Sequence, residues 1–146
     1  MKHTQEQFIE VCAGNQEAAN CLATLIEYSC LLDNIVDEEG DRSQETIAQV
    51  SCKLFICLTG NEFWAKNKHT ILPLVLQSFR TWVDADIWAK SGDPKKEIAA
   101  DVLKGFASEI VFWFAFLCGG WEHQRLMSEK HREINWDNRY IEEITR

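Results

Sequence analysis

Apolar residues recur along this chain at spacings of three and four positions and never alternate over a strand-length run, a pattern that predicts an all-α protein. No Asn-Gly or Asp-Gly dipeptide indicates a hairpin turn. Cap residues and glycines divide the apolar runs into about six helices of one bundle. The predicted helices are a short one between Thr4 and Gly14, followed by 16–38, 44–58, 70–90, 94–118 and 121–133. Residues 62–68 are expected to form one or two further turns, and the tail a short helix after Asp137.

Size and charge narrow the class of protein. A chain of 146 residues fits a single domain, 1–146, with a core of its own. The net charge of −8 disfavours nucleic acid as a partner, because phosphate binding needs basic patches. No basic region precedes an early apolar run, and the most apolar run, Ile110–Cys118, is too short to span a bilayer. We therefore expect a cytoplasmic protein without a membrane span.

Cysteines and aromatic residues are abundant. None of the six cysteines forms a Cys-x-x-Cys pair, and most fall in apolar helices, which favours buried reduced thiols over a zinc site or a disulfide framework. Six tryptophans and eight phenylalanines are many for a small monomer. Some of them are therefore expected at a subunit interface, which predicts a homo-oligomer.

Carboxylates fall within the apolar arcs of three predicted helices, arcs that are expected to face the core. Asp33 and Asp37 stand one turn apart on helix 16–38, Asp86 lies in the arc of helix 70–90, and Glu109 in that of helix 94–118. Helical bundles gather carboxylates in this way to hold Mg²⁺ or paired metal ions. A shared metal site is thus predicted, against the alternative that each acid pairs with a nearby cation such as Arg80 or Lys90.

The stretch LIEYSCLLDNIVDEEGDRS, residues 25–43, resembles the first aspartate-rich motif of the class I isoprenoid synthases. That motif is Asp-Asp-x-x-Asp at the end of a long helix, often followed by Glu and a basic loop. Asp33 and Asp37 match its outer aspartates, Asn34 replaces the middle one, and Glu38 and Arg42 occupy the positions that follow. The resemblance implies a reduced helical relative in which the aspartates hold Mg²⁺, and Mg²⁺ holds a diphosphate.

A second similarity lies in Asp101, Gly105 and Glu109, which follow the four-plus-four spacing of a metal-binding motif in terpene cyclases. Gly105 replaces the hydroxyl residue of that motif, and the chain has no second Asp-Asp-x-x-Asp. The similarity implies that Asp101 could join Glu109 near the ligand.

Three functions remain open on these grounds. The first is binding or processing of a diphosphate through Mg²⁺ held by Asp33, Asp37, Asp86 and Glu109, with Asn34, Glu38, Arg42 and Asp101 near the ligand. The second is a non-enzymatic, oligomeric helical interaction protein. The third is an all-α nucleotide pyrophosphatase, whose Glu-x-x-Glu and Glu-x-x-Asp motifs are not evident here. No nucleophilic triad or glycine-rich phosphate loop is present.

Overall fold

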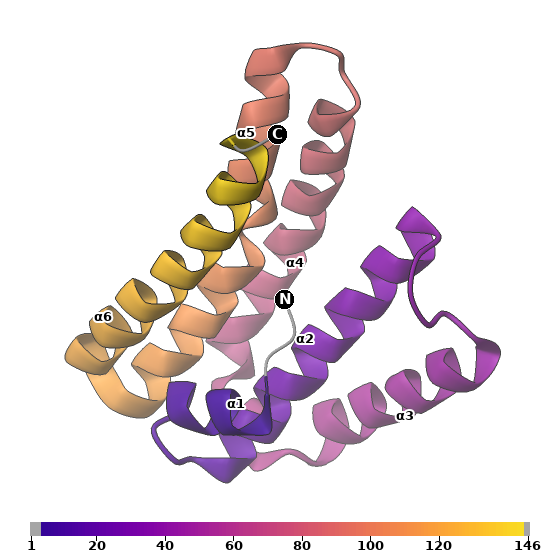
Figure 1. Ribbon diagram of the computed structural model, residues 1–146. Helices are drawn as coiled ribbons and strands as arrows, with labels where there is room; N and C mark the ends of the chain where they lie inside the picture. Colours follow the sequence, from indigo (N-terminus) through magenta and orange to yellow (C-terminus); the bar gives the residue numbers. More distant parts are fainter. Residues whose placement is uncertain (1–3, 145–146) are drawn as a thin grey trace.

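The computed structural model describes the backbone of residues 4–144 and the side chains of residues 4–132. The described chain is helical, without strands, and folds as one domain, which confirms the predicted all-α class (Figure 1). Its elements are α1 (Gln5–Val11), α2 (Gln16–Asp37), α3 (Gln44–Gly60), α4 (Glu62–Ala89), α5 (Pro94–Lys104) and α6 (Ala107–Ile144).

Polar caps begin the helices where the sequence predicts them. Thr4 accepts a hydrogen bond from the Gln7 backbone N, and the Gln7 side chain accepts one from Thr4 N at 2.7 Å, so α1 has a complete capping box. The side chains of Asn15 and Ser43 cap α2 and α3 by accepting from the backbone N of Ala18 and Thr46. Asp93 caps α5 ahead of a proline in its first turn.

The fourth helix begins eight residues earlier than predicted. Asn61 follows the last residue of α3 and also caps α4, where its side chain accepts a hydrogen bond from Trp64 N at 2.9 Å. The turns expected at residues 62–68 and the helix expected from Thr70 are therefore one helix. Pro73 lies inside it rather than in its first turn, at the cost of one backbone hydrogen bond.

The predicted helix 94–118 is divided at Gly105. Gly105 N and Phe106 N bond to carbonyls three residues back, and Ser108 and Glu109 repeat this tight spacing. Glycine has poor helix propensity, so α5 ends at Lys104 and α6 starts at Ala107.

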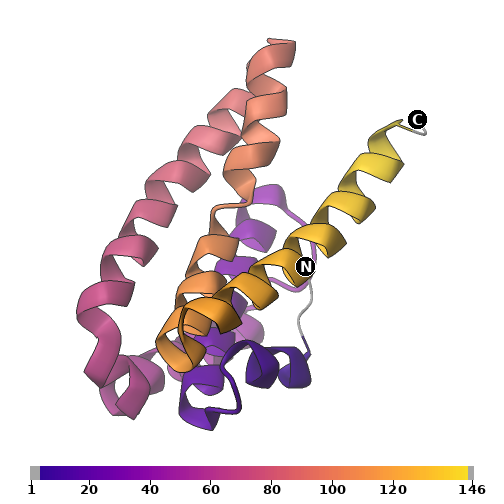
Figure 2. The same cartoon turned by 90° about the vertical axis from the view of Figure 1, so that its left-hand side faces the viewer.

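Gly120 divides α6 into two arms, residues 107–119 and 121–144. Its φ of 82° and ψ of −173° lie outside the helical region, so the predicted stop at Gly119–Gly120 is confirmed. Figure 2 shows the two arms running in different directions from this point. The second arm continues past the predicted end at Glu133 and takes in the helix expected after Asp137, up to Ile144.

The buried core lies at one end of the molecule, which we call the base. It joins α1, the first half of α2, the end of α3, the start of α4 and both arms of α6 around the turn at Gly120 (Figure 1). The fully buried Phe114 stacks at a tilt on Phe63, with ring centroids 5.2 Å apart. The buried members of this cluster are Phe8, Val11, Cys12, Ala18, Ala19, Cys21, Leu22, Cys57, Trp64, Ile71, Ile110, Val111, Phe112, Phe114, Ala115 and Met127.

The most apolar run of the chain contributes to this core. By length and composition, the segment Pro94–Arg132 is the one described helical stretch that could cross a membrane, and 28% of its most apolar window is buried in the fold. Gly105 and Gly120 interrupt the segment, and the helix between them extends only roughly 20 Å. The hydrocarbon core of a bilayer is about 30 Å thick.

The opposite end of the molecule is formed by helix hairpins rather than by a core. α5 packs along α4, and among the described helices α4 is its principal neighbour. This α4–α5 hairpin stands clear of the second arm of α6 (Figure 2). α3 packs back along α2 and meets α4 only near their junction, so it forms a second hairpin (Figure 1).

Candidate functional site

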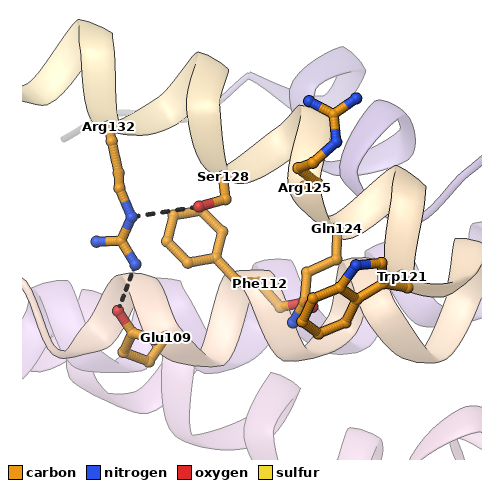
Figure 3. A pocket seen from close by; sticks show the side chains of 7 residues that line it. All are labelled: Glu109, Phe112, Trp121, Gln124, Arg125, Ser128 and Arg132. Atoms are coloured by element: carbon orange, nitrogen blue, oxygen red, sulfur yellow. Dashed lines mark hydrogen bonds and ion pairs between the residues drawn. The ribbon is translucent and has the colours of Figure 1, made fainter.

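A shallow pocket of about 280 Å³ lies between the two arms of α6 (Figure 3). Arg132 spans it: one guanidinium nitrogen lies 2.9 Å from Glu109 Oε1, and Nε donates to Ser128 Oγ at 3.2 Å. The same guanidinium lies 4.8 Å above the centre of the Phe112 ring, a cation–π contact. Trp121, Gln124 and Arg125 complete the lining.

The charges of this pocket are already paired. Arg125 binds Glu122 at 3.1 Å and Glu129 at 3.0 Å, both on its own helix. The Gln124 side-chain nitrogen donates to the Phe112 carbonyl across the arms at 3.1 Å. The Gln124–Phe112 and Arg132–Glu109 contacts join the two arms of α6, and both arginines of the pocket have a carboxylate partner. The arrangement is therefore structural.

Asp33 lies where α2 passes α4. Although the residue is exposed, loss of solvation raises the pKa of the Asp33 carboxyl, and the charge of Asp37 raises it further. A hydrogen bond from Trp82 and the charge of Lys104 act in the opposite direction. Asp33 therefore interacts with Asp37 one turn on, and also with Trp82 of α4 and Lys104 of α5.

The end of α2 is shaped by Asn34 and Gly40. The Asn34 carbonyl accepts from Glu39 N at 3.0 Å and from Glu38 N, and Glu38 adopts a left-handed conformation with φ 55°. A Cβ on Gly40 would approach Asn34 Nδ2 to 2.8 Å, so the turn packs directly on this side chain. Asn34 and Glu38 thus terminate the helix, and Arg42 is exposed in the loop beyond it.

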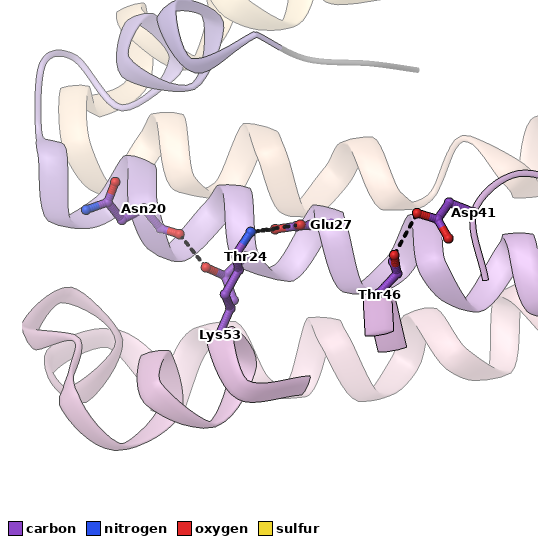
Figure 4. Close-up of polar contacts among 6 residues, drawn as sticks. All are labelled: Asn20, Thr24, Glu27, Asp41, Thr46 and Lys53. Carbon is purple, nitrogen blue, oxygen red and sulfur yellow. Dashed lines mark hydrogen bonds and ion pairs between the residues drawn. The ribbon is translucent and has the colours of Figure 1, made fainter. Parts of the chain in front are cut away.

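Asp41 orders the turn that leads into α3, a role that was not predicted from the sequence. Its carboxylate accepts from Thr46 Oγ1 at 2.6 Å (Figure 4) and from Ser43 N at 3.1 Å. The Thr46 hydrogen bond is the main cause of a lowered Asp41 pKa. An aspartate two residues before a serine cap is the sequence signal for this turn. Further along the same hairpin, Lys53 of α3 binds Glu27 of α2 at 3.1 Å (Figure 4).

The other predicted ligands lie in separate settings. Asp86 pairs with Lys90 one turn on at 2.9 Å, and Glu109 pairs with Arg132, as described above. Asp101 lines a groove of about 370 Å³ at the tip of the α4–α5 hairpin, with Ala89, Pro94, Glu97 and Ile98. Asp33, Asp37 and Glu109 are exposed and Asp86 is half-buried, so the expectation that these acids face the core is wrong. The helix arcs that carry them turn partly to solvent.

Among the described side chains, no three of the His, Cys, Asp and Glu groups lie close enough to hold one metal ion. Asp33 and Asp37 are two oxygen donors on one helical turn, and Mg²⁺ commonly takes one or two carboxylates and fills its remaining positions with water and phosphate. These two residues fit such a partial site. The shared site of four carboxylates stays a prediction.

Two pairs of thiols meet between helices. A hydrogen bond to Cys118 and burial raise the pKa of the Cys12 thiol, and Cys57 and burial do the same for Cys21. Raised pKa values keep these two groups protonated and unreactive. Cys12, Cys21 and Cys57 are buried and belong to the core, as expected of small hydrophobes, whereas Cys30 and Cys52 are exposed.

An exposed apolar face lies along α4, although the sequence pattern predicts that this face is part of the core. Five large side chains of that face are 37–59% exposed: Leu72, Leu76, Phe79, Val83 and Ile87. Their four-three-four spacing from 72 to 83 is the sequence signal, because it is that of a helix seam. Other exposed apolar residues include Phe55 and Ile56 of α3 and Ile98 and Val102 of α5, each 65–69% exposed.

Comparison of the chain with models of known protein families, with curated proteins and with solved structures finds no match.

Proposed function

We propose that this protein is a non-enzymatic helical interaction protein that works as an oligomer. One observation carries the proposal: large apolar side chains remain exposed along α3, α4 and α5 in a chain whose described residues already form one compact core at the base. Single exposed apolar residues are ordinary, but an aligned set of them marks an interaction surface.

The polar sites support this choice because they have local structural roles. The arginines of the α6 pocket are bound to carboxylates, and Asp86 is bound to Lys90. Buried side-chain nitrogen and oxygen atoms all have hydrogen-bond partners within the described part of the chain. Active sites typically contain side chains whose pKa values are strongly shifted for catalysis. The side chains described here instead form ion pairs that hold neighbouring parts of the helices together.

The test is sedimentation velocity over a hundredfold range of protein concentration, with and without Mg²⁺. An oligomer whose mass is a multiple of 16.9 kDa, and whose association does not respond to Mg²⁺, supports the proposal. A monomer at every concentration contradicts it.

A second candidate function, Mg²⁺-dependent diphosphate binding, is favoured by one observation: Asp33 and Asp37 repel each other on one turn while Lys104 acts on Asp33 from α5. A metal ion between the two carboxylates would remove this repulsion, and Lys104 would add a cation near a bound phosphate. Thermal unfolding with Mg²⁺ and pyrophosphate tests this candidate. Stabilisation that Asp33→Ala plus Asp37→Ala abolishes supports it, and the absence of stabilisation rules it out.

A further inference from the structure

The exposed apolar residues of α4 form one continuous stripe. At 100° per residue, Leu72, Leu76, Phe79, Val83 and Ile87 fall within roughly 80° of helix circumference, over a length of roughly 22 Å. The buried Ile71 and Ala85 of the same helix lie about 100° or more from the middle of this stripe, on the sides that pack within the subunit. α4 thus has two apolar sides, and the described residues of the chain fully bury only one of them.

The stripe is large enough to be an interface. Each of its five side chains is 37–59% exposed, which leaves on the order of 100 Å² uncovered per residue and roughly 500 Å² per chain. Complete burial of such a stripe against an identical one removes roughly 1,000 Å² in total, which is the minimum expected of a biological interface and the size of the smaller, weaker ones. The four-three-four spacing of residues 72–83 also lets two such helices interlock as a coiled-coil seam.

Charge indicates which partner fits. The chain as a whole carries −8, yet residues 70–90 carry two cations and two anions. These charges pair within the helix, Arg80 with Asp84 at 2.6 Å and Lys90 with Asp86 at 2.9 Å. A locally neutral apolar stripe places no unpaired like charges opposite each other when two copies of the chain meet there. It offers no excess positive charge to an anionic lipid surface and no excess negative charge to a basic protein.

We propose that two copies of this chain associate through α4, with the stripe of residues 72–87 of one copy packed against the same stripe of the other. A two-fold axis makes such a contact self-complementary and closes it at a dimer. The inference rests on the proposed function, because it names the surface and the partner of the oligomer.

The test compares two double variants of the full chain by sedimentation velocity. Leu76→Glu plus Val83→Glu places two charges in the stripe, and Ile56→Glu plus Val102→Glu places two charges on α3 and α5 at residues that are each 69% exposed. Both variants change net charge equally, so a general increase in repulsion affects them alike. We expect the α4 double to weaken dimerisation at least about tenfold and the control double to change it less than about threefold.

Each outcome decides the matter. A wild-type chain that is monomeric overturns both this inference and the proposed oligomer. Binding of that monomer to vesicles of mixed anionic and neutral lipid would then assign the stripe to a lipid surface. A wild-type oligomer that the α4 double leaves intact, or that the control double disrupts equally, overturns the α4 interface while the oligomer stands. If the glutamate double loses helical circular dichroism, Leu76→Ala plus Val83→Ala against Ile56→Ala plus Val102→Ala makes the same comparison without added charge.

Discussion

The base of the molecule and the α4–α5 hairpin use the same kind of side chain with opposite results. At the base, Leu22 and Phe114 are fully buried because α1, α2, α4 and α6 all reach them. On the α4–α5 hairpin, Leu76 and Val102 are 59% and 69% exposed because each of these two helices has the other as its main neighbour. Burial in this protein is therefore decided by how many elements reach a residue, and residues of equal hydrophobicity serve folding in one region and are available for association in the other.

Matched leucine substitutions test this comparison with the largest expected effect. Leu22→Ala removes a fully buried side chain and should reduce the free energy of unfolding by about 2–5 kcal/mol. Leu76→Ala should cost less than about 1 kcal/mol, because the side chain is 59% exposed and alanine favours the helix. Urea unfolding at low micromolar concentration measures both, and equal losses would contradict the division into two regions.

Gly120 should be the next most sensitive position, because it sets the turn that closes the base. Its φ of 82° with ψ of −173° is a conformation that only glycine adopts readily, so Gly120→Ala should cost about 1–3 kcal/mol. The control is Gly60→Ala at the end of α3, where an added Cβ meets nothing within 4 Å and φ is ordinary. Thermal unfolding of both variants checks this. An unfolding temperature that Gly120→Ala leaves unchanged would show that alanine fits the turn without strain.

Acid should weaken the base through His131. This residue is 6% exposed beside Phe112, and burial lowers the pKa of its imidazole below the usual 6.5. The unfolded chain therefore binds the proton more readily, and stability should fall as pH decreases from 6.5 through the lowered folded value. His131→Gln should flatten this part of the stability curve measured by urea unfolding. If the variant loses as much unfolding free energy at acid pH as the wild type, other groups are responsible for the loss.

Asp33 should show the opposite pH dependence with a smaller effect. Its pKa is raised above the usual 3.8, so the cost of holding the charged carboxylate appears as pH rises through and above that value. Asp33→Asn should stabilise the protein at pH 7 by less than about 1 kcal/mol, since solvent screens an exposed group, and this gain should disappear as pH falls through 3.8. Stability curves of the variant and the wild type check this, and a destabilised variant at pH 7 would indicate that the carboxylate is needed.

Much of the fold can be predicted from local signals. Caps such as Thr4, Asn15, Ser43 and Asp93 act within one turn of themselves, so the sequence is enough to place the helices that they begin. The roles of Asn61 and Gly105 are harder to predict from the sequence. Asn is compatible with both ends of a helix, and Gly is compatible with the inside or the end of one. Their roles depend on how α4 and α6 pack against the rest of the chain.

The candidate sites depend still more on tertiary structure. The sequence places Asp33 and Asp37 on one turn, and that pairing is local. The partners of Glu109 and Asp33 come from elsewhere in the chain: Arg132 is 23 residues away, and Trp82 and Lys104 belong to other helices. Helical periodicity identifies an apolar face but carries no information on whether another element covers it.

By itself, the sequence determined the all-α class, most of the helix starts and the turn at Gly119–Gly120, because these follow from hydrogen bonds and backbone preferences within a few residues. Only the tertiary structure decided which apolar faces became core. The described part of the chain packs on one side of α4 and leaves Leu72, Leu76, Phe79, Val83 and Ile87 partly exposed on the other, since burial is a property of the assembled elements and not of any one helix.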